Sequence, residues 1–168
     1  MSETLWAPWR MDYILSDKST GCVFCDALAE GPKRHVDNLI LHEEKNAFVI
    51  MNRFPYTHAN IMVVPRRHLC RLGDLGTEER HDLFDLVVQS QQTLEKALQP
   101  QGMNLGMNLG TVAGAGIKDH LHVHIVPRWN GDTNFMPVIA DTRVMPEHLN
   151  ETYQILRRFF VELGPVTE

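Results

Sequence analysis

The stretch "DHLHVHIVPRW", residues 119–129, decides the fold because it places three histidines at alternate positions. These are His120, His122 and His124. Side chains on a β-strand point to opposite faces in turn, so a strand would put all three imidazoles on one face and the intervening apolar residues on the other. A helix would rotate each residue by about 100° and scatter the histidines. The β-branched residues and the closing Pro127 also favour a strand.

Three imidazoles on one strand face indicate chemistry rather than packing, because burying them for structure alone would cost desolvation and require three partners. Two kinds of site fit the pattern. One is a metal site, which binds through neutral imidazole nitrogens. The other is a nucleophilic site, in which one imidazole attacks phosphorus and its neighbours orient it or stabilise charge. The glycine-rich stretch "GTVAGAGIKD", residues 110–119, leads into the histidines, and its small residues let backbone N–H groups approach an anion such as phosphate.

Outward from this strand, apolar runs bounded by turn residues predict four more strands. They cover residues 38–42, 47–52, 59–65 and 102–110. Apolar residues at helical spacing predict two helices, one from Thr77 as N-cap to Pro100 and one over residues 145–164. Short connections favour a mainly antiparallel sheet of about five strands packed with two main helices. The expected fold class is α+β, in a single domain over residues 1–168 with an N-terminal extension over 1–20.

The bulk composition argues against several classes of protein. The chain has 168 residues, 43% of them hydrophobic and 22% charged, and a formal net charge of −5. This acidic balance argues against a general nucleic-acid-binding surface. No apolar stretch approaches the roughly 20 residues that cross a bilayer. Three cysteines, an odd number without an export signal, favour a reduced, cytoplasmic protein over a disulfide framework.

The motif "CVFC" places Cys22 and Cys25 at Cys-x-x-Cys spacing, which fits half of a zinc site, a redox motif or two packed thiols. A thioredoxin-like motif would follow a strand, and the polar stretch "SDKSTG" upstream does not supply one. Zinc would need two further ligands. His68, which follows a predicted strand, and His120 are the candidates.

Several stretches together resemble the histidine triad superfamily of nucleotide hydrolases and transferases. "HLHVHIVPR" is similar to the family's H-x-H-x-H signature, and "AFVIMNRFPYTHANIMVVPRRH" resembles its upstream hairpin with an Asn-x-x-Pro loop. "GMNLGMNLGTVAGAGIKDHLHVHIVPRWNGDTNF" and the opening "LWAPWRMDYI" are most similar to the bacterial branch that contains diadenosine tetraphosphate phosphorylases. The resemblance covers most of the chain and implies a HIT-like fold.

The resemblance also implies a reaction and a role for each histidine. His122 matches the family nucleophile, which would attack the α-phosphorus of a dinucleoside polyphosphate and form a covalent nucleotidyl-histidine. His124 would touch phosphate oxygens, and His120 would hold the local architecture. The second nitrogen of His122 should donate to an acceptor such as a backbone carbonyl, which fixes the reactive tautomer. Asn108 could face the nucleophile if a strand over 103–109 pairs with the histidine strand.

The same resemblance implies a set of nucleotide contacts, in which Asn52 would accept hydrogen bonds from the ribose hydroxyls. The other contacts are Ile50, Met51 and Pro55 beside the sugar and base, Gly114, Ala115 and Gly116 in the glycine-rich loop, and Asn108, His122 and His124. Many relatives carry Gln or Ser in this loop to contact phosphate, whereas this chain has Ala115-Gly116. Backbone N–H groups or Lys118 would have to take over that contact.

The missing loop side chain leaves the second half-reaction open. Inorganic phosphate or water could accept the nucleotidyl group, which would make the protein a phosphorylase or a hydrolase. A zinc-stabilised nucleotide-binding or signalling module without turnover is the alternative. Removal of adenylate from DNA ends is disfavoured by the acidic net charge.

A metal site and a partner are implied by resemblance as well. Galactose-1-phosphate uridylyltransferase and several bacterial triad proteins pair a Cys-x-x-Cys motif with a histidine after the upstream hairpin and with the first triad histidine. We therefore predict a closed, tetrahedral, structural zinc site, which leaves no position open for water. Its ligands are Cys22, Cys25, His68 and His120. Cys70 is expected to be an ordinary buried cysteine. Family members are commonly dimers, which implies a homodimer that binds an adenine nucleotide or dinucleoside polyphosphate, with inorganic phosphate as a possible co-substrate.

Overall fold

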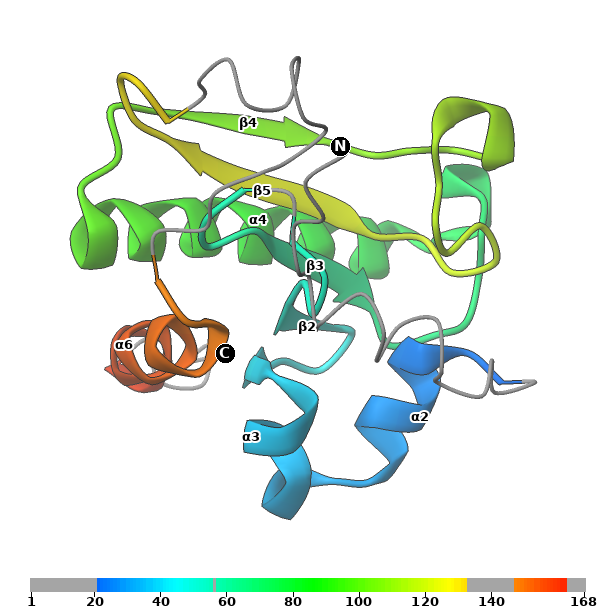
Figure 1. The fold of residues 1–168 in the computed structure, drawn as a ribbon. Helices are drawn as coiled ribbons and strands as arrows, with labels where there is room; N and C mark the ends of the chain where they lie inside the picture. Colours follow the sequence, from blue (N-terminus) through cyan, green and yellow to red (C-terminus); the bar gives the residue numbers. More distant parts are fainter. Residues whose placement is uncertain (1–20, 56, 133–146, 163–168) are drawn as a thin grey trace, which may run out of the picture.

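A computed structural model describes residues 21–55, 57–132 and 147–162 of the chain (Figure 1). The N-terminal extension expected over 1–20 lies outside the described residues, as do both ends of the helix expected over 145–164. None of the helices in the described part combines the length and apolar composition that a bilayer crossing needs.

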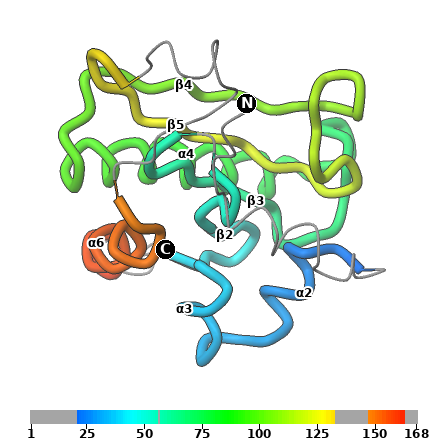
Figure 2. The backbone as a smooth tube through the Cα atoms, viewed as in Figure 1, coloured from blue at the N-terminus to red at the C-terminus, as the bar shows by residue number. Residues whose placement is uncertain are grey.

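The centre of the fold is a five-stranded sheet in the order β1-β2-β3-β5-β4. Every neighbouring pair is antiparallel, so the predicted α+β fold class is confirmed. The strands are β1 (Ile40–Glu43), β2 (Ala47–Met51), β3 (Ile61–Pro65), β4 (Gly102–Gly106) and β5 (Val123–Arg128). The histidine-bearing strand β5 lies inside the sheet, between β3 and the edge strand β4, as Figures 1 and 2 show.

In the described part of the chain, two long helices and two short ones pack around the sheet. They are α2 (Val23–Ala29), α3 (His35–Asn38), α4 (Thr77–Leu98) and α6 (Leu149–Glu162), with single 3₁₀ turns at Pro32–Arg34, Leu72–Asp74 and Thr111–Ala113. The long helices match the predicted ones, except that Gly76 rather than Thr77 is the N-cap of α4. There the Gly76 N–H donates to the Glu79 carboxylate over 2.7 Å, which satisfies one free donor of the first turn. The short helices α2 and α3 were not predicted, because they contain too few residues to show the helical spacing of apolar side chains.

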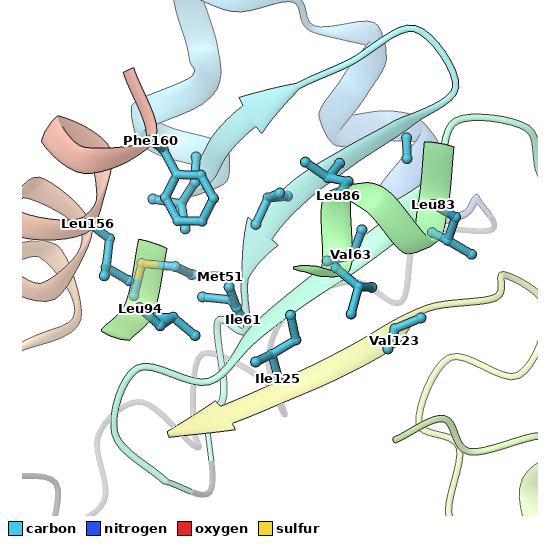
Figure 3. Packing of buried hydrophobic residues seen from close by; sticks show 14 of the residues in the cluster. Met51, Ile61, Val63, Leu83, Leu86, Leu94, Val123, Ile125, Leu156 and Phe160 are labelled. Carbon is cyan, nitrogen blue, oxygen red and sulfur yellow. The ribbon is translucent and has the colours of Figure 1, made fainter. Parts of the chain in front are cut away.

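The sheet has a different apolar layer on each face. On one face, alternate residues of β2, β3 and β5 pack against α4 and α6, and Figure 3 shows Val63, Val123 and Ile125 in this cluster. On the other face, Phe24 of α2 joins a smaller cluster with residues of β1, β2 and β3. The two faces are therefore covered differently. The long helices α4 and α6 pack on one face, and the short helix α2 packs on part of the other.

Helix α6 holds the edge strand β1 at an irregularity. The register of β1 against β2 shifts between Ile40 and His42, where the ladder is locally irregular. The Tyr153 hydroxyl donates to the Ile40 carbonyl over 3.0 Å, and the Arg157 guanidinium donates to that of Leu41. Helix α6 thereby provides hydrogen-bond donors for two backbone carbonyls of β1.

Strand β4 is shorter than the predicted strand over 102–110. It ends at Gly106, and the residues after it form an exposed loop that includes the 3₁₀ turn before β5. Asn104 therefore lies on the strand, where its side-chain oxygen accepts from Arg128 of β5 over 2.9 Å. Asn108, which the predicted strand would have included, lies in the loop instead.

Candidate active site and metal cluster

The three histidines lie along one line at and before the start of β5. His124 is opposite Met62 of β3 and Gly106 of β4, on the face that α2 partly covers. Val123 and Ile125 point to the opposite face and pack in the helix-side cluster. His120 and His122 precede the strand and are both buried. The alternation expected of a strand therefore holds here, although regular pairing begins only at Val123.

His122 has one nitrogen fixed by a hydrogen bond. Its Nδ1 lies 2.8 Å from the carbonyl oxygen of His120. Because a carbonyl can only accept, Nδ1 carries the proton, and Nε2 of the neutral ring keeps its lone pair. Burial lowers the pKa of His122 below its ordinary value, and the hydrogen bond to His120 opposes that shift in part. The arrangement keeps a neutral imidazole with one free basic nitrogen.

His124 packs edge-on against His122, with ring centroids 4.9 Å apart. Burial, and then the neighbouring His122, lower the pKa of His124 to about 4. Its Nδ1 lies 3.3 Å from the side-chain oxygen of Asn60, a buried residue that sequence reasoning missed. Asn60 lies two residues before Met62 and thus shares the histidine face of the sheet, which is the signal that could have found it.

The glycine-rich loop uses much of its own backbone internally. Gly110 and Gly114 have φ angles of 88° and 87°, in the region that glycine adopts readily. The N–H groups of Gly114 and Ala115 donate to the carbonyls of Thr111 and Gly110 over 3.0 and 3.3 Å. Asn108 Nδ2 donates to the Gly114 carbonyl over 3.3 Å, so its side chain braces the loop. Gly114, Ala115 and Gly116 were expected to contact the nucleotide, and the N–H groups of the first two already donate to carbonyls within the loop.

The residues expected around the nucleotide lie at the end of β2 and in the loop that follows it, and they do not all face the same side of the sheet. Ile50 pairs with Met62 and belongs to the cluster on the histidine face. Met51 points the other way and is buried in the helix-side core, as Figure 3 shows, because strand alternation moves it to the opposite face. The prediction that Met51 borders the sugar and base therefore does not fit its position. Asn52 accepts from the Phe54 N–H over 3.0 Å, which turns the chain towards the partly exposed Pro55.

Four residues far apart in the sequence form a compact ligand cluster. They are Cys22, Cys25, His68 and His120, with ligand atoms all within 4.8 Å of one another. The Cys22 sulfur lies 3.2 Å from His120 Nδ1, and the Cys25 sulfur lies 3.4 Å from His68 Nδ1 and 3.6 Å from His120 Nδ1. Tetrahedral zinc with ordinary bond lengths would hold such sulfur–nitrogen pairs about 3.5 Å apart. The cluster could therefore hold a metal ion, and its donor set and spacing fit zinc.

The surroundings of the cluster also suit a metal. His120 Nε2 donates to the Pro65 carbonyl over 2.8 Å, which leaves Nδ1 free to bind and fixes the ring. Burial, together with neighbouring Cys22, raises the pKa of the Cys25 thiol to about 11, the reverse of what a redox-active thiol needs. Cys70 was expected to be buried but is exposed. It lies in the loop between the end of β3 at Pro65 and the 3₁₀ turn at Leu72–Asp74.

Comparison with known proteins agrees with this geometry. The HIT domain family matches residues 33–131. An AP-4-A phosphorylase from Mycobacterium tuberculosis is 33% identical over 92% of this chain and 82% of its own length. A Schizosaccharomyces pombe bis(5'-nucleosyl)-tetraphosphatase (asymmetrical) is 34% identical over 58% of this chain and 53% of its own.

A solved structure adds to the comparison. The crystal structure of a Zn-bound histidine triad family protein from Mycobacterium smegmatis aligns with a TM-score of 0.66 and 26% identity, covering 86% of this chain and 96% of that one. The family match spans more than half of the chain, and the histidine strand lies within it. The chain is therefore a member of the histidine triad (HIT) domain family.

Proposed function

We propose that the protein transfers a nucleotidyl group from a dinucleoside polyphosphate such as diadenosine tetraphosphate. The observation that carries the proposal is the state of His122, whose Nδ1 is committed to the His120 carbonyl while Nε2 keeps its lone pair. In the proposed first step, Nε2 attacks the α-phosphorus and the bond to the leaving polyphosphate oxygen breaks. The electron pair of that bond leaves with the polyphosphate, and a nucleotidyl-His122 intermediate remains.

The neighbouring residues would bind and orient the substrate. We assign His124 to the phosphate oxygens and Asn52, Ile50 and Pro55 to the ribose and base. Gly106 leaves open space opposite His124, since among the described residues no atom other than those of Gly106 and its chain neighbours lies within 4 Å of where its Cβ would be. In the loop, the Gly116 N–H and the Lys118 ammonium are the donors we propose for phosphate, since Gly114 and Ala115 donate within the loop. Asn108 would act indirectly, by bracing Gly114.

In the second step, inorganic phosphate or water would attack the phosphorus and release His122. The relative named as a phosphorylase supports phosphate, and the one named as a tetraphosphatase supports water. Incubating the protein with diadenosine tetraphosphate, with and without phosphate, separates the two. A diphosphate product that forms only with phosphate would identify a phosphorylase, and turnover without phosphate would identify a hydrolase.

The same assay tests the covalent step. We expect His122→Ala to abolish turnover and the trapping of labelled adenylate on the protein. His81→Ala, which removes an exposed histidine of α4, should retain both. Equal turnover by His122→Ala would overturn the mechanism. Nucleotide binding without turnover by the wild type would instead support a binding module, the alternative favoured by the absence of a side-chain donor at Ala115-Gly116.

We propose that the ligand cluster holds structural zinc. All four ligands come from the protein, so the bound ion would cross-link α2 to the segments around His68 and His120 and would take no part in chemistry. Thiolate ligands must stay reduced, and the three cysteines are free, which supports a cytoplasmic setting.

We also propose a homodimer formed through α4 and β4. β4 is an edge strand of the described sheet and exposes Leu105, and α4 exposes Phe84 and Val88. A hollow of about 320 Å³ between α4 and β4, lined by Gln91, Glu95, Met103 and Leu105 among others, lies away from the three histidines. An uncovered edge and an apolar patch are the features that pairing with a second copy would bury.

A further inference from the structure

We infer that Phe24 is a positioning residue that couples the metal cluster to the orientation of His122. The inference rests on the proposed role of His122 as the nucleophile. Phe24 is the third residue of "CVFC", so it lies between the two cysteine ligands in the sequence. It is 2% exposed and belongs to the apolar cluster on the histidine face of the sheet.

The Phe24 ring contacts one histidine of each site. Its centroid lies 5.4 Å from that of His120 at an interplanar angle of 85°, and 5.3 Å from that of His122 at 56°. Such tilted and edge-on contacts are the favoured arrangements of aromatic rings. Phe24 thus lies against both the metal ligand and the proposed nucleophile.

Among the described residues, the His122 ring has one hydrogen bond and two ring contacts, and Phe24 makes one of those contacts. One hydrogen bond, to the His120 carbonyl, holds Nδ1, and His124 packs against the ring edge. The hydrogen bond limits rotation of the ring about its Cβ–Cγ bond but leaves a range of that angle open. Since reactive geometry tolerates little displacement, the apolar wall that Phe24 provides would decide where Nε2 points.

The metal cluster in turn fixes Phe24, because α2 has little stability of its own. The helix has seven residues, and its N-cap, Cys22, makes no side-chain capping hydrogen bond. A helix this short is not stable alone and depends on tertiary contacts. A metal ion bound by Cys22, Cys25, His68 and His120 would hold its first turn, and Phe24 lies within that turn. Metal binding would therefore fix Phe24, and Phe24 would fix His122.

The test compares Phe24→Leu with Phe48→Leu in the zinc-loaded protein. Phe48 is fully buried in the same cluster but is not among the rings that contact either histidine in the described part of the chain, so it controls for the loss of a buried ring. We expect Phe24→Leu to lower kcat by about 10- to 100-fold, with KM changed by less than about twofold. It should keep the zinc content of the wild type, and Phe48→Leu should keep most of kcat.

Equal loss of kcat in the two variants, or loss of zinc from Phe24→Leu, would overturn the inference. Phe24→Met, which also lacks a ring, should repeat the result and replaces Phe24→Leu if that variant does not fold.

A spectroscopic readout separates this inference from the proposed function. In protein with ¹⁵N-labelled histidine, the His122 ring signals should shift in Phe24→Leu and stay in place in Phe48→Leu. Removing zinc from the wild type should move the same signals. Unmoved His122 signals in Phe24→Leu would refute the coupling even if the enzyme is active, whereas a wild type without turnover would refute only the proposed reaction.

Discussion

At the scale of single residues, the spacing of the histidines contained most of the information about the site. Alternation along one strand placed His124 and Ile125 on opposite faces, as the structure shows. The same rule, applied to β2, would have moved Met51 from the histidine face of the sheet to the helix-side core. The acceptor for His122 could not be predicted, because the carbonyl of His120 reaches Nδ1 only through the local path of the chain just before β5.

The buried state of His124 predicts a pH effect on stability. Its pKa is lowered from 6.5 to about 4 in the folded protein, so between these values the unfolded chain binds more protons. The free energy of unfolding should therefore fall as the pH decreases from 6.5 towards 4, and this contribution should be fully present above 6.5. Urea unfolding at several pH values measures it.

His124→Asn is the matched variant for this effect. Other acid-sensitive groups, including the metal ligands, remain in both proteins, so the difference between the two pH curves isolates His124. A slope that is equal in the wild type and in His124→Asn throughout this pH range would contradict the prediction.

At the scale of elements, the long, periodic segments were predictable and the short ones were not. Helices α4 and α6 and all five strands follow from apolar spacing and turn residues. Helix α2 has no such pattern, because its seven residues are too few to show a period and its one buried residue, Phe24, packs on the sheet. The end of β4 at Gly106 could not be predicted either, because the repeat in "GMNLGMNLG" continues from the strand into the loop without a change of pattern.

Loss of one cysteine ligand should therefore act on α2 in particular. We expect Cys25→Ala to bind less than one zinc ion per chain and to lose hydrogen-exchange protection in α2, while the amides of β3 and β5 stay protected. Metal analysis and hydrogen exchange followed by mass spectrometry measure the two effects. Cys70→Ala, which removes an exposed thiol outside the cluster, should behave as the wild type. Full zinc content in Cys25→Ala would place the ligands elsewhere.

The anchoring of β1 by α6 gives a second prediction at this scale. Tyr153→Phe removes the donor to the Ile40 carbonyl and leaves that oxygen buried without its partner. The protein should lose about 1–3 kcal/mol of stability, measured as a lower urea midpoint at unchanged m value. An unchanged midpoint would mean that another donor replaces the hydroxyl.

At the scale of the whole molecule, the exposed apolar surface of α4 and β4 is the feature that a single chain does not explain. Phe84 is 68% exposed and Leu105 is 50% exposed. If two copies pair there, Phe84→Glu and Leu105→Glu should shift the protein from dimer to monomer in sedimentation velocity. Val161→Glu places the same charge at a 59% exposed residue of α6 and should leave the dimer intact. A monomeric wild type would refute the dimer.

The place of β5 within the sheet has a consequence for how the chain folds. Among the described residues β5 is the last strand, yet it lies between β3 and β4. Its pairing with β3 joins residues about sixty positions apart, such as Ile61 and Ile125. During synthesis, β3 therefore emerges long before its second neighbour exists, and its open edge can pair with another nascent chain. Chains that stop short of residue 123 should aggregate, and full-length chains should gain most of their native structure only after β5 has left the ribosome.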